Sequence, residues 1–407
     1  MPQARTASVA FIFVVLLLDT LGIGVIIPVL PRLIESFVHE DLGEASRYYG
    51  WFVAAYATMQ VIFAPILGAL GDRFGRRPVI LSSLLGAALD YLLLAFAPSL
   101  GWLFVGRVIA GITGASFSTA TAYMADVTPP EKRAQSFGLV GAAFGIGFIL
   151  GPAAGGLLGG VHLRAPFLVA AGLNALNLLY GIFVLPESLP KESRRAFSLA
   201  RANPLGSLKN LGRSSILLGL TLTLVCSYLA QMILQSVWAL HTQARFGWQP
   251  FDVGLSLAVV GVATGLVQGG LVRVAIPKLG EERAVLVGLA FNVAGFVAFA
   301  FATRGWQMYA ILFPFALGGL AGPAIQALLS RGVPSGEQGE LQGSLASVQS
   351  ICSIFGPLLG TGLFGHFAPA AATPHFPGAP YLAAAALNFV GGLAAARLFA
   401  RRRAAIR

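Results

Sequence analysis

The sequence predicts an all-α membrane protein with twelve transmembrane helices arranged in two pseudo-symmetric six-helix lobes. Three observations predict this fold class: a very apolar composition, twelve long apolar segments, and a repeat between the two halves of the chain. Of the 407 residues, 56% are hydrophobic and only 11% are charged, whereas soluble domains carry about 25% charged residues. A chain this apolar cannot cover a surface that faces water, so its solvent must be largely lipid.

Twelve segments are long enough to cross a bilayer, which takes about 20 mostly apolar residues. Their unbroken apolar runs predict helices rather than barrel strands. The first segment continues past Asp19 to Leu30 without a cleavage site, so we expect a transmembrane helix there and not a signal peptide. The predicted spans are 8–31, 48–70, 78–98, 101–124, 135–159, 164–185, 214–240, 251–276, 283–302, 305–329, 340–365 and 379–399.

The basic residues predict which span ends face the cytoplasm. With the N-terminus inside, the inner segments hold 21 of the 27 Lys and Arg residues, and the outer loops hold five. Cytoplasmic loops carry such an excess, so we expect a multi-pass protein of the inner (plasma) membrane with both termini in the cytoplasm. Topology thereby explains the net charge of +11, and no nucleic-acid partner is expected.

The two halves repeat each other at a constant offset of 205 residues. Gly75 pairs with Gly280, and Gly151-Pro152 pairs with Gly356-Pro357. Six helices per copy make the copies parallel, with an axis along the membrane normal, as in two-lobed secondary transporters. This duplication would not be expected of a channel or a receptor. The predicted domains are an N-terminal lobe at 1–185, a cytoplasmic linker at 186–213, and a C-terminal lobe with a basic tail at 214–407.

Three ionisable side chains lie inside predicted spans, where a charge costs about 2.5–3.5 kcal/mol even on mild insertion scales. Asp19 and Asp90 lie near the middle of spans one and three, and Arg107 lies in the outer half of span four. One or both aspartates are predicted to carry protons, because a low dielectric favours the protonated carboxyl and a nearby arginine opposes it. The alternative is a permanent ion pair that fixes helix register. Which aspartate carries the proton stays open.

The loop between spans two and three contains Asp72, Arg73, Arg76 and Arg77. One interpretation is a tight turn whose basic residues hold the loop in the cytoplasm. The other is a cytoplasmic gate, in which Asp72 and Arg76 form inter-helix ion pairs that release during transport. The turn alone does not need Asp72.

Span five carries a glycine at every fourth residue, and Pro152 interrupts the run. This spacing lets a second helix approach closely, and Pro152 can bend the span because it lacks a backbone N–H. Tight helix packing explains part of this pattern. The functional interpretation adds a flexible seam between span five and either span eight or the opposite lobe. The glycines are Gly147, Gly151, Gly155 and Gly159.

Polar uncharged side chains are predicted to shape a substrate cavity. Three pairs share a helix face at a spacing of three or four residues, and two further amides lie in the C-terminal half. Each alone is more typical of an interhelical hydrogen bond, but as a set they suit a polar, ring-shaped, partly charged substrate. They are Tyr56 and Gln60, Asn174 and Asn177, Gln231 and Gln235, Asn292, and Gln326.

No resident cofactor is expected. Cys226 and Cys352 lie in apolar stretches without metal-ligand spacing. The sequence also lacks a glycine-rich phosphate loop ending in Lys-Ser or Lys-Thr, which argues against ATP hydrolysis. Protons are the expected coupling ion.

Four segments in order along the chain resemble motifs of major facilitators. LDTLGIGVIIPVLP (18–31) looks like the first-helix motif of the drug/proton antiporter branch, and GALGDRFGRRP (68–78) resembles the signature loop of the superfamily. GRVIAGITGA (106–115) resembles the fourth-helix motif with its intramembrane arginine, and GIGFILGPAAGG (145–156) resembles the fifth-helix antiporter motif. Together with LGAALDY (85–91) and FATRGW (301–306), they make the chain similar to TetA-type tetracycline/proton antiporters.

This resemblance implies the major facilitator fold and a proton-coupled antiporter that exports an amphipathic drug by alternating access. A monomer is expected. The first candidate is tetracycline as a metal chelate, so Mg²⁺ would enter only as part of the substrate. Two positions depart from the tetracycline exporters: Gly71 replaces the usual serine and Asn292 the usual aspartate.

Broader multidrug, sugar or metabolite export by the same superfamily is the alternative. A membrane-embedded enzyme would cluster polar catalytic residues near one interface. It is not expected, because Asp19, Asp90 and Arg107 are isolated at depth in the spans.

Overall fold

The computed structural model describes residues 2–39, 41–114, 117–194, 215–334 and 337–406. Within these ranges the chain is helical and contains no strand, and twelve segments are long and apolar enough to span a membrane. The all-α fold class and the twelve spans are therefore confirmed, and the ends of the spans differ from the predicted ones by a few residues.

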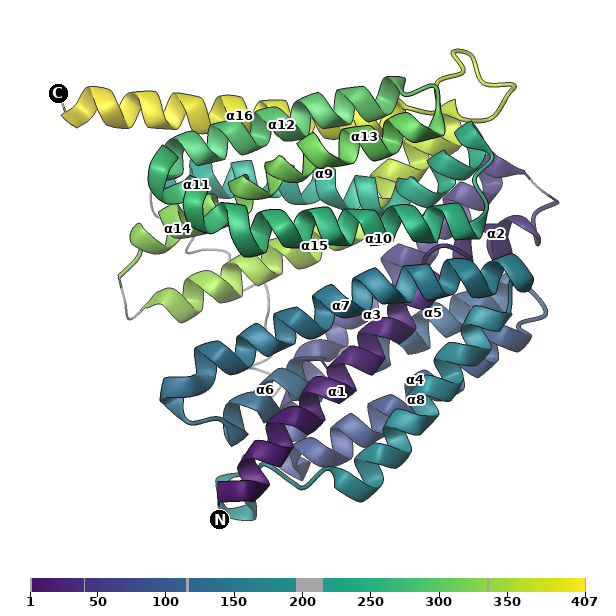
Figure 1. The fold of residues 1–407 in the computed structure, drawn as a ribbon, viewed down its shortest axis with the longest axis vertical. Coiled ribbons are helices and arrows are strands. Elements are labelled where there is room, and N and C mark those ends of the chain that lie inside the picture. The colour runs from purple at the N-terminus through teal and green to yellow at the C-terminus, as the bar shows by residue number, and fades with distance from the viewer. Residues whose placement is uncertain (1, 40, 115–116, 195–214, 335–336, 407) are drawn as a thin grey trace. The chain divides into compact units, whose positions relative to one another are not determined.

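The first half of the chain supplies six spans (Figure 1). Span four is made of α5 and α6 together. The helices are α1 (Pro2–Ile26), α2 (Leu30–Glu35), α3 (Leu42–Phe74), α4 (Arg76–Phe96), α5 (Leu100–Gly114), α6 (Phe117–Val127), α7 (Arg133–Val161) and α8 (Ala165–Val184), with short 3-10 turns at Pro130–Lys132 and Lys191–Ser193.

The second half supplies the other six, two of which are interrupted. Span eight consists of α10, a π-helical segment and α11, and span ten consists of α13, a 3-10 segment and α14. The elements are α9 (Ser215–Phe246), α10 (Pro250–Leu266), the π segment Val267–Leu271, α11 (Val272–Leu279), α12 (Glu281–Phe301), α13 (Gly305–Ala316), the 3-10 segment Leu317–Leu320, α14 (Ala321–Arg331), α15 (Gln338–Phe367) and α16 (Ala379–Ile406).

The first span is shorter than the predicted range of 8–31. The helix α1 ends at Ile26, a turn follows, and the chain resumes as the six-residue helix α2. Pro28 and Pro31 lie at this break. Because proline lacks the N–H that continues a helix, the prolines explain why α1 stops early.

By their contacts the residues form two compact units, each with its own core. Unit 1 comprises Met1–His39, Ala55–Asn203 and Gln249–Ala258, and unit 2 comprises Glu40–Ala54, Pro204–Trp248 and Val259–Arg407. Two short helix segments, at the starts of α3 and α10, thus group differently from the predicted lobes. Most of the predicted linker 186–213 lies outside the described residues.

The 205-residue repeat reappears as a repeat of local structure and packing. The helices α4 and α12 are both 21 residues long and follow a glycine with positive φ, Gly75 at 106° and Gly280 at 77°. In unit 1, α1 packs on α7 and α8, and α4 packs on α8; in unit 2, α9 packs on α15 and α16, and α12 packs on α16. The same helix arrangement is therefore built twice.

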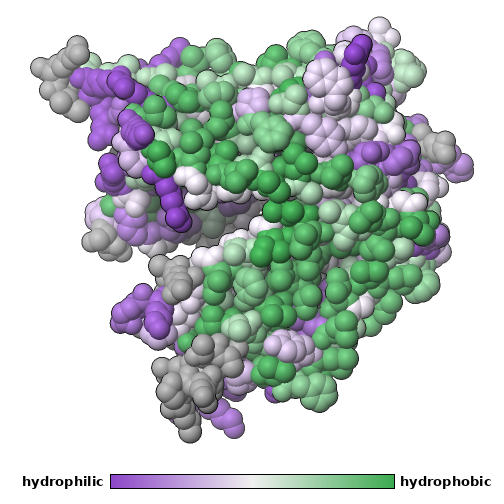
Figure 2. All heavy atoms as spheres, viewed as in Figure 1, coloured by the Kyte–Doolittle hydropathy of each residue, from purple (hydrophilic) through white to green (hydrophobic). Residues whose placement is uncertain are grey.

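The helices present apolar side chains outward along their middle sections, whereas hydrophilic residues gather near helix ends (Figure 2). Phe183 is 82% exposed, and Leu157, Leu176 and Phe301 are also exposed. In water such a surface would aggregate, whereas in a bilayer it faces lipid tails. The chain is a multi-pass membrane protein.

Alanine at Gly75 is expected to destabilise the protein more than alanine at Gly280. Both positions combine positive φ with ψ of 156° and 153°, a region essentially confined to glycine that costs another residue about 1–3 kcal/mol. A Cβ at Gly75 would also lie 2.7 Å from the carboxylate carbon of Glu187, whereas a Cβ at Gly280 meets nothing within 4 Å. Thermal unfolding of the two purified variants in detergent measures the difference. An equal loss of thermal stability in the two variants would show that the contact with Glu187 does not add to the cost.

Candidate functional site

An ion pair is buried inside unit 1, between Asp90 on α4 and Arg107 on α5. The Arg107 Nη2 lies 3.5 Å from the Asp90 Oδ2, and the two side chains are only 7% and 1% exposed. The residue before the arginine is Gly106, where a Cβ would lie 2.9 Å from the Asp90 Oδ1. A glycine at this point allows α5 to approach α4 closely enough for the pair to form.

The pair is incompletely satisfied. The Asp90 Oδ1 and the Arg107 Nε are buried and have no hydrogen-bond partner among the described residues. A buried ion pair that only supports the fold repays its desolvation when its remaining polar atoms are also bonded. A single long contact with one free oxygen instead suits a carboxylate that binds and releases a proton.

Asp19 lies on α1, and its side chain is half-buried. One turn further along α1, a Cβ at Gly22 would lie 3.0 Å from the Asn174 Nδ2 and 3.5 Å from the Tyr91 hydroxyl. Tyr91 in turn interacts electrostatically with Asp19, Asp90 and Arg107. Both predicted proton carriers therefore belong to one polar region between α1, α4 and α5.

Span two completes this region. The Gln60 Nε2 donates a hydrogen bond to the Tyr56 hydroxyl at 3.0 Å, and Tyr56 interacts electrostatically with both aspartates and the arginine. A Cβ at Gly114 of α5 would lie 3.0 Å from that hydroxyl. We call the six residues Asp19, Tyr56, Gln60, Asp90, Tyr91 and Arg107 the N-half polar cluster.

The two asparagines of span six make hydrogen bonds to backbone carbonyls. The Asn174 Nδ2 donates to the Ala170 carbonyl at 3.0 Å, and the Asn177 Nδ2 donates to the Val15 carbonyl of α1 at 3.2 Å. Both residues are buried. Asn177 thereby links α8 to α1. Such hydrogen bonds within and between helices are the alternative to substrate binding for these two asparagines, and their role in substrate binding stays a prediction.

The predicted amides of the C-terminal half lie in unit 2. Gln231 and Gln235 are exposed on α9, and Gln326 is exposed on α14 and hydrogen-bonded to Tyr228. Asn292 on α12 is half-buried and lies against the backbone of Gly318. Their role in substrate binding also stays a prediction.

Arg76, the first residue of α4, makes the ion pairs at the junction between α3 and α4. Its Nη2 lies 2.6 Å from the Asp72 Oδ1, and its Nε lies 3.3 Å from the Asp126 Oδ2. It thus connects α3, α4 and α6. The other two arginines have different contacts: Arg73 stacks on the ring of Phe74 at 5.1 Å, and Arg77 donates to the Ile182 carbonyl at 2.7 Å.

Sequence reasoning missed Asp126 and Glu187, which complete this loop. The Glu187 carboxylate accepts hydrogen bonds from the backbone N–H groups of Arg76 at 2.8 Å and Arg77 at 3.3 Å. It therefore caps the N-terminus of α4, where Gly75 has no side chain to do so. The signal in the sequence is weak: each is an acidic residue close to the end of an apolar span.

The glycine run of span five packs on α1. A Cβ at Gly151 would lie 2.8 Å from the Gly24 Cα, and one at Gly147 would lie 2.6 Å from the Thr20 Cβ. The start of α10, which belongs to unit 1, also meets α7: a Cβ at Gly156 would lie 3.2 Å from the Gly254 Cα. In the predicted run, Gly147, Gly151 and Gly155 thus face span one, and Gly159 also meets the start of span eight, where a Cβ would lie 3.2 Å from the Pro250 Cβ.

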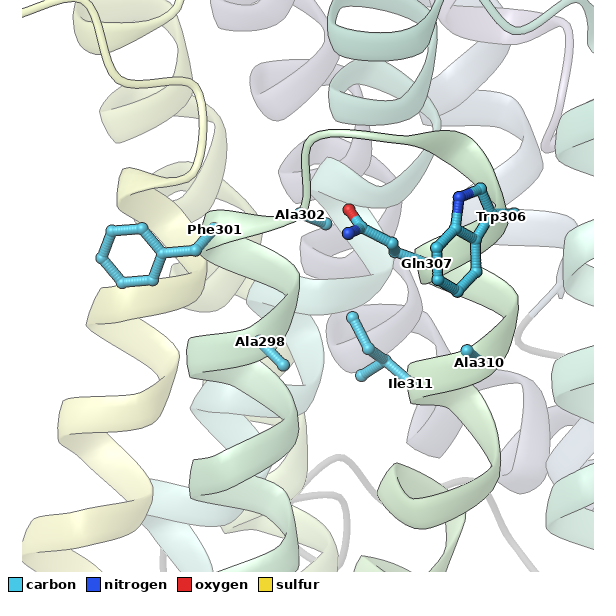
Figure 3. Close-up of a pocket in the computed structure, with 7 residues that line it drawn as sticks. All are labelled: Ala298, Phe301, Ala302, Trp306, Gln307, Ala310 and Ile311. Carbon is cyan, nitrogen blue, oxygen red and sulfur yellow. The ribbon is translucent and has the colours of Figure 1, made fainter.

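A shallow cavity of about 340 Å³ lies elsewhere, between α12 and α13 of unit 2 (Figure 3). Phe301, Trp306 and Ile311 give it an apolar lining. Its one amide, Gln307, points its oxygen at the backbone N–H groups of Thr303 and Arg304, at 2.7 and 2.9 Å. The Gln307 oxygen thus caps the N-terminus of α13.

Twelve spans built as a duplicated six-helix arrangement, with ionisable groups buried within the spans, define a secondary transporter. The sequence profile described as Major Facilitator Superfamily matches residues 12–357 and 225–407, and the chain belongs to this family.

Several curated relatives are bacterial resistance proteins. The chain is 45% identical to tetracycline resistance protein, class C, of Escherichia coli, over 92% of each chain. It is 40% identical to the class H protein of Pasteurella multocida, over 86% of this chain and 88% of the relative, and 38% identical to the class B protein of Escherichia coli, over 89% and 90%. The resemblance drawn from the motifs is confirmed.

Solved structures with lower identity share the fold. The human organic anion transporter MFSD10 (TETRAN) superposes with a TM-score of 0.67 at 24% identity, covering 96% of this chain and 99% of its own. The nucleoside transporter NupG superposes with a TM-score of 0.76 at 12% identity, covering 96% and 98%. At these identities the likeness concerns the fold alone.

Replacing Glu187 with alanine is expected to loosen the N-terminus of α4. The change removes the acceptor of two helix N–H groups, and the loss of a helix cap costs about 1 kcal/mol. Thermal unfolding in detergent measures the effect. Glu192→Ala, which removes an exposed carboxylate from the same segment, is the control. If both variants unfold at the same temperature as the wild type, the cap does not stabilise α4.

Proposed function

We propose that this protein is a proton-coupled antiporter that exports tetracycline, as a metal–tetracycline chelate, by alternating access. The substrate is inferred from the identity of 38–45% to several tetracycline resistance proteins over most of the chain. The buried and incompletely satisfied Asp90–Arg107 pair supports the coupling to protons.

The proton step follows from the electrostatics of the N-half polar cluster. When Asp90 is ionised, it neutralises Arg107 at 3.5 Å. A proton on Asp90 removes that charge and leaves Arg107 to interact with another anion, such as Asp19 or an acidic group of the drug. The charge state of one carboxyl thereby changes which partner the arginine binds.

The loop around Arg76 would serve as the cytoplasmic gate. In this structure Arg76 holds Asp72 and Asp126 together. Release of these ion pairs would let α3 and α6 move independently, and their formation would restore one closed arrangement. Because the Asp72 side chain is 43% exposed, its ion pair contributes little stability and can open at small cost.

The remaining features of the proposal follow from this activity. The partners are a small-molecule drug and the lipid bilayer, and Mg²⁺ belongs to the substrate chelate. The protein has no cofactor of its own, catalyses no chemical conversion, and acts as a monomer. It lies in the inner (plasma) membrane with both termini in the cytoplasm, in line with the excess of Lys and Arg in the predicted inner segments.

Tetracycline is expected to drive proton movement in everted membrane vesicles that contain the wild-type protein. Asp19→Asn and Asp90→Asn should each reduce this movement about tenfold or more, because an amide cannot bind the transported proton. Asp41→Asn, which alters an exposed loop carboxylate, is the matched control. Full drug-dependent proton movement in both span variants would refute the coupling assignment.

Orientation is tested by labelling single cysteines in a protein from which Cys226 and Cys352 have been removed. A cysteine at Ser99 should react with an impermeant maleimide added outside intact cells, and one at Ser193 should react only after the cytoplasmic side is opened. The opposite pattern would reverse the topology and move the gate to the outer side.

A further inference from the structure

Span eight is interrupted in the middle of its apolar run. Between α10 and α11 the residues Val267–Leu271 form a π-helical turn. Such a turn is wider than an α-helical turn, and its hydrogen bonds join residues five apart, as in the bond from the Val272 N–H to the Val267 carbonyl. Gln268, Gly269 and Gly270 are exposed in this turn, and a Cβ at either glycine meets no atom within 4 Å. The turn therefore borders open space.

Span ten is interrupted too. A 3-10 segment at Leu317–Leu320 separates α13 from α14. Pro323 lies four residues after Gly319 and has no N–H to offer the Gly319 carbonyl. The donor that a regular helix would offer to this one carbonyl is therefore missing.

The two breaks adjoin each other within unit 2. A Cβ at Gly319 would lie 3.6 Å from the Val267 Cγ1 and 3.9 Å from the Gln268 Cγ. Beyond the breaks, α11 and α14 lie toward the same end of unit 2 (Figure 1). Irregular backbone at membrane depth is tolerated where it is covered by protein or lines a water-filled space. Two breaks at one level thus indicate a polar, solvated region and not a defect of one helix.

A third helix points an amide at the same place. Asn292 of α12 lies so close to Gly318 that a Cβ there would collide with its carboxamide, and Gly288, one turn earlier, lies close to the Ala321 N. Within the described part of the chain neither Asn292 nor Gln268 makes a hydrogen bond. Two amides without partners in apolar spans are costly unless water or a ligand bonds to them.

We propose that Gln268, Asn292 and the two backbone breaks form a neutral subsite that accepts hydrogen bonds from donor groups of the exported drug. The proposal rests on the proposed export of tetracycline, and it names the part of unit 2 that binds the drug. Suitable donors are hydroxyl groups, a carboxamide N–H, or water bound to the chelated metal. Because the subsite has no charge of its own, it binds the drug without taking up a proton.

The first experiment asks whether the breaks border water and is independent of any drug. Gly270→Cys, in a protein without Cys226 and Cys352, is treated with a water-soluble maleimide. The new side chain has room, since nothing lies within 4 Å of its Cβ. Leu393→Cys, at an exposed leucine in span twelve, is the lipid-facing control. Labelling of Gly270→Cys but not of Leu393→Cys supports the subsite, and an unreactive Gly270→Cys overturns it.

The second experiment measures tetracycline binding to purified protein. Gln268→Met and Asn292→Leu keep side-chain size but remove the amide, so each should raise Kd about fivefold or more. Proton movement at saturating drug should persist, because the proton carriers are unchanged. Leu266→Met, at an exposed residue just before the π turn, should leave Kd within about twofold of the wild type.

The two experiments separate the failure of the subsite from the failure of the proposed function. Unchanged Kd in both amide variants, with normal binding by the wild type, would refute the subsite alone. A wild-type protein that neither binds nor transports tetracycline would refute the proposed function, and Gly270→Cys labelling would still decide whether the breaks face water.

Discussion

The absence of water from the bilayer core is the constraint on which this structure depends. Every backbone N–H and C=O at that depth must be bonded within the protein, so the spans are helices, and helices pack where glycines let backbones meet. The contact of Gly151 with Gly24 shows how close this approach becomes. Against such regularity the interruptions at Val267–Leu271 and Leu317–Leu320 stand out. They are tolerable only where other polar groups or water replace the lost bonds.

The same constraint makes buried charge costly, and the two halves treat it differently. Unit 1 holds Asp90 against Arg107. At the 205-residue offset the partner of Asp90 is Gly295, and a Cβ there would lie 2.5 Å from the Phe315 ring. An aromatic side chain thus packs where the first half has a carboxylate. This asymmetry agrees with a division of labour in which the first half titrates and the second half binds through neutral amides.

The helix that carries Asp90 is anchored at both ends by charges of the sign that its dipole favours. Glu187 accepts hydrogen bonds from the first N–H groups of α4. At the other end, the Arg164 guanidinium donates to the carbonyls of Ala95 at 3.1 Å and Ala97 at 3.0 Å. Negative charge at a helix N-terminus and positive charge at its C-terminus are both stabilising. Both anchors lie next to the ends of α8, so they tie α4 to that helix within unit 1.

The sequence by itself determined the twelve spans, the duplication and the buried ionisable residues, because each leaves a local or periodic trace: apolar length, a constant offset, or a charge inside an apolar run. It did not determine which residues meet. Glu187 caps a helix that begins 111 positions earlier, and Asp126 pairs with an arginine 50 positions away. The sequence also predicted that Gly151 lies at a close helix contact, but it did not identify α1 as the neighbouring helix. Only the tertiary structure decided these partners, because contacts between distant segments arise from how whole helices pack.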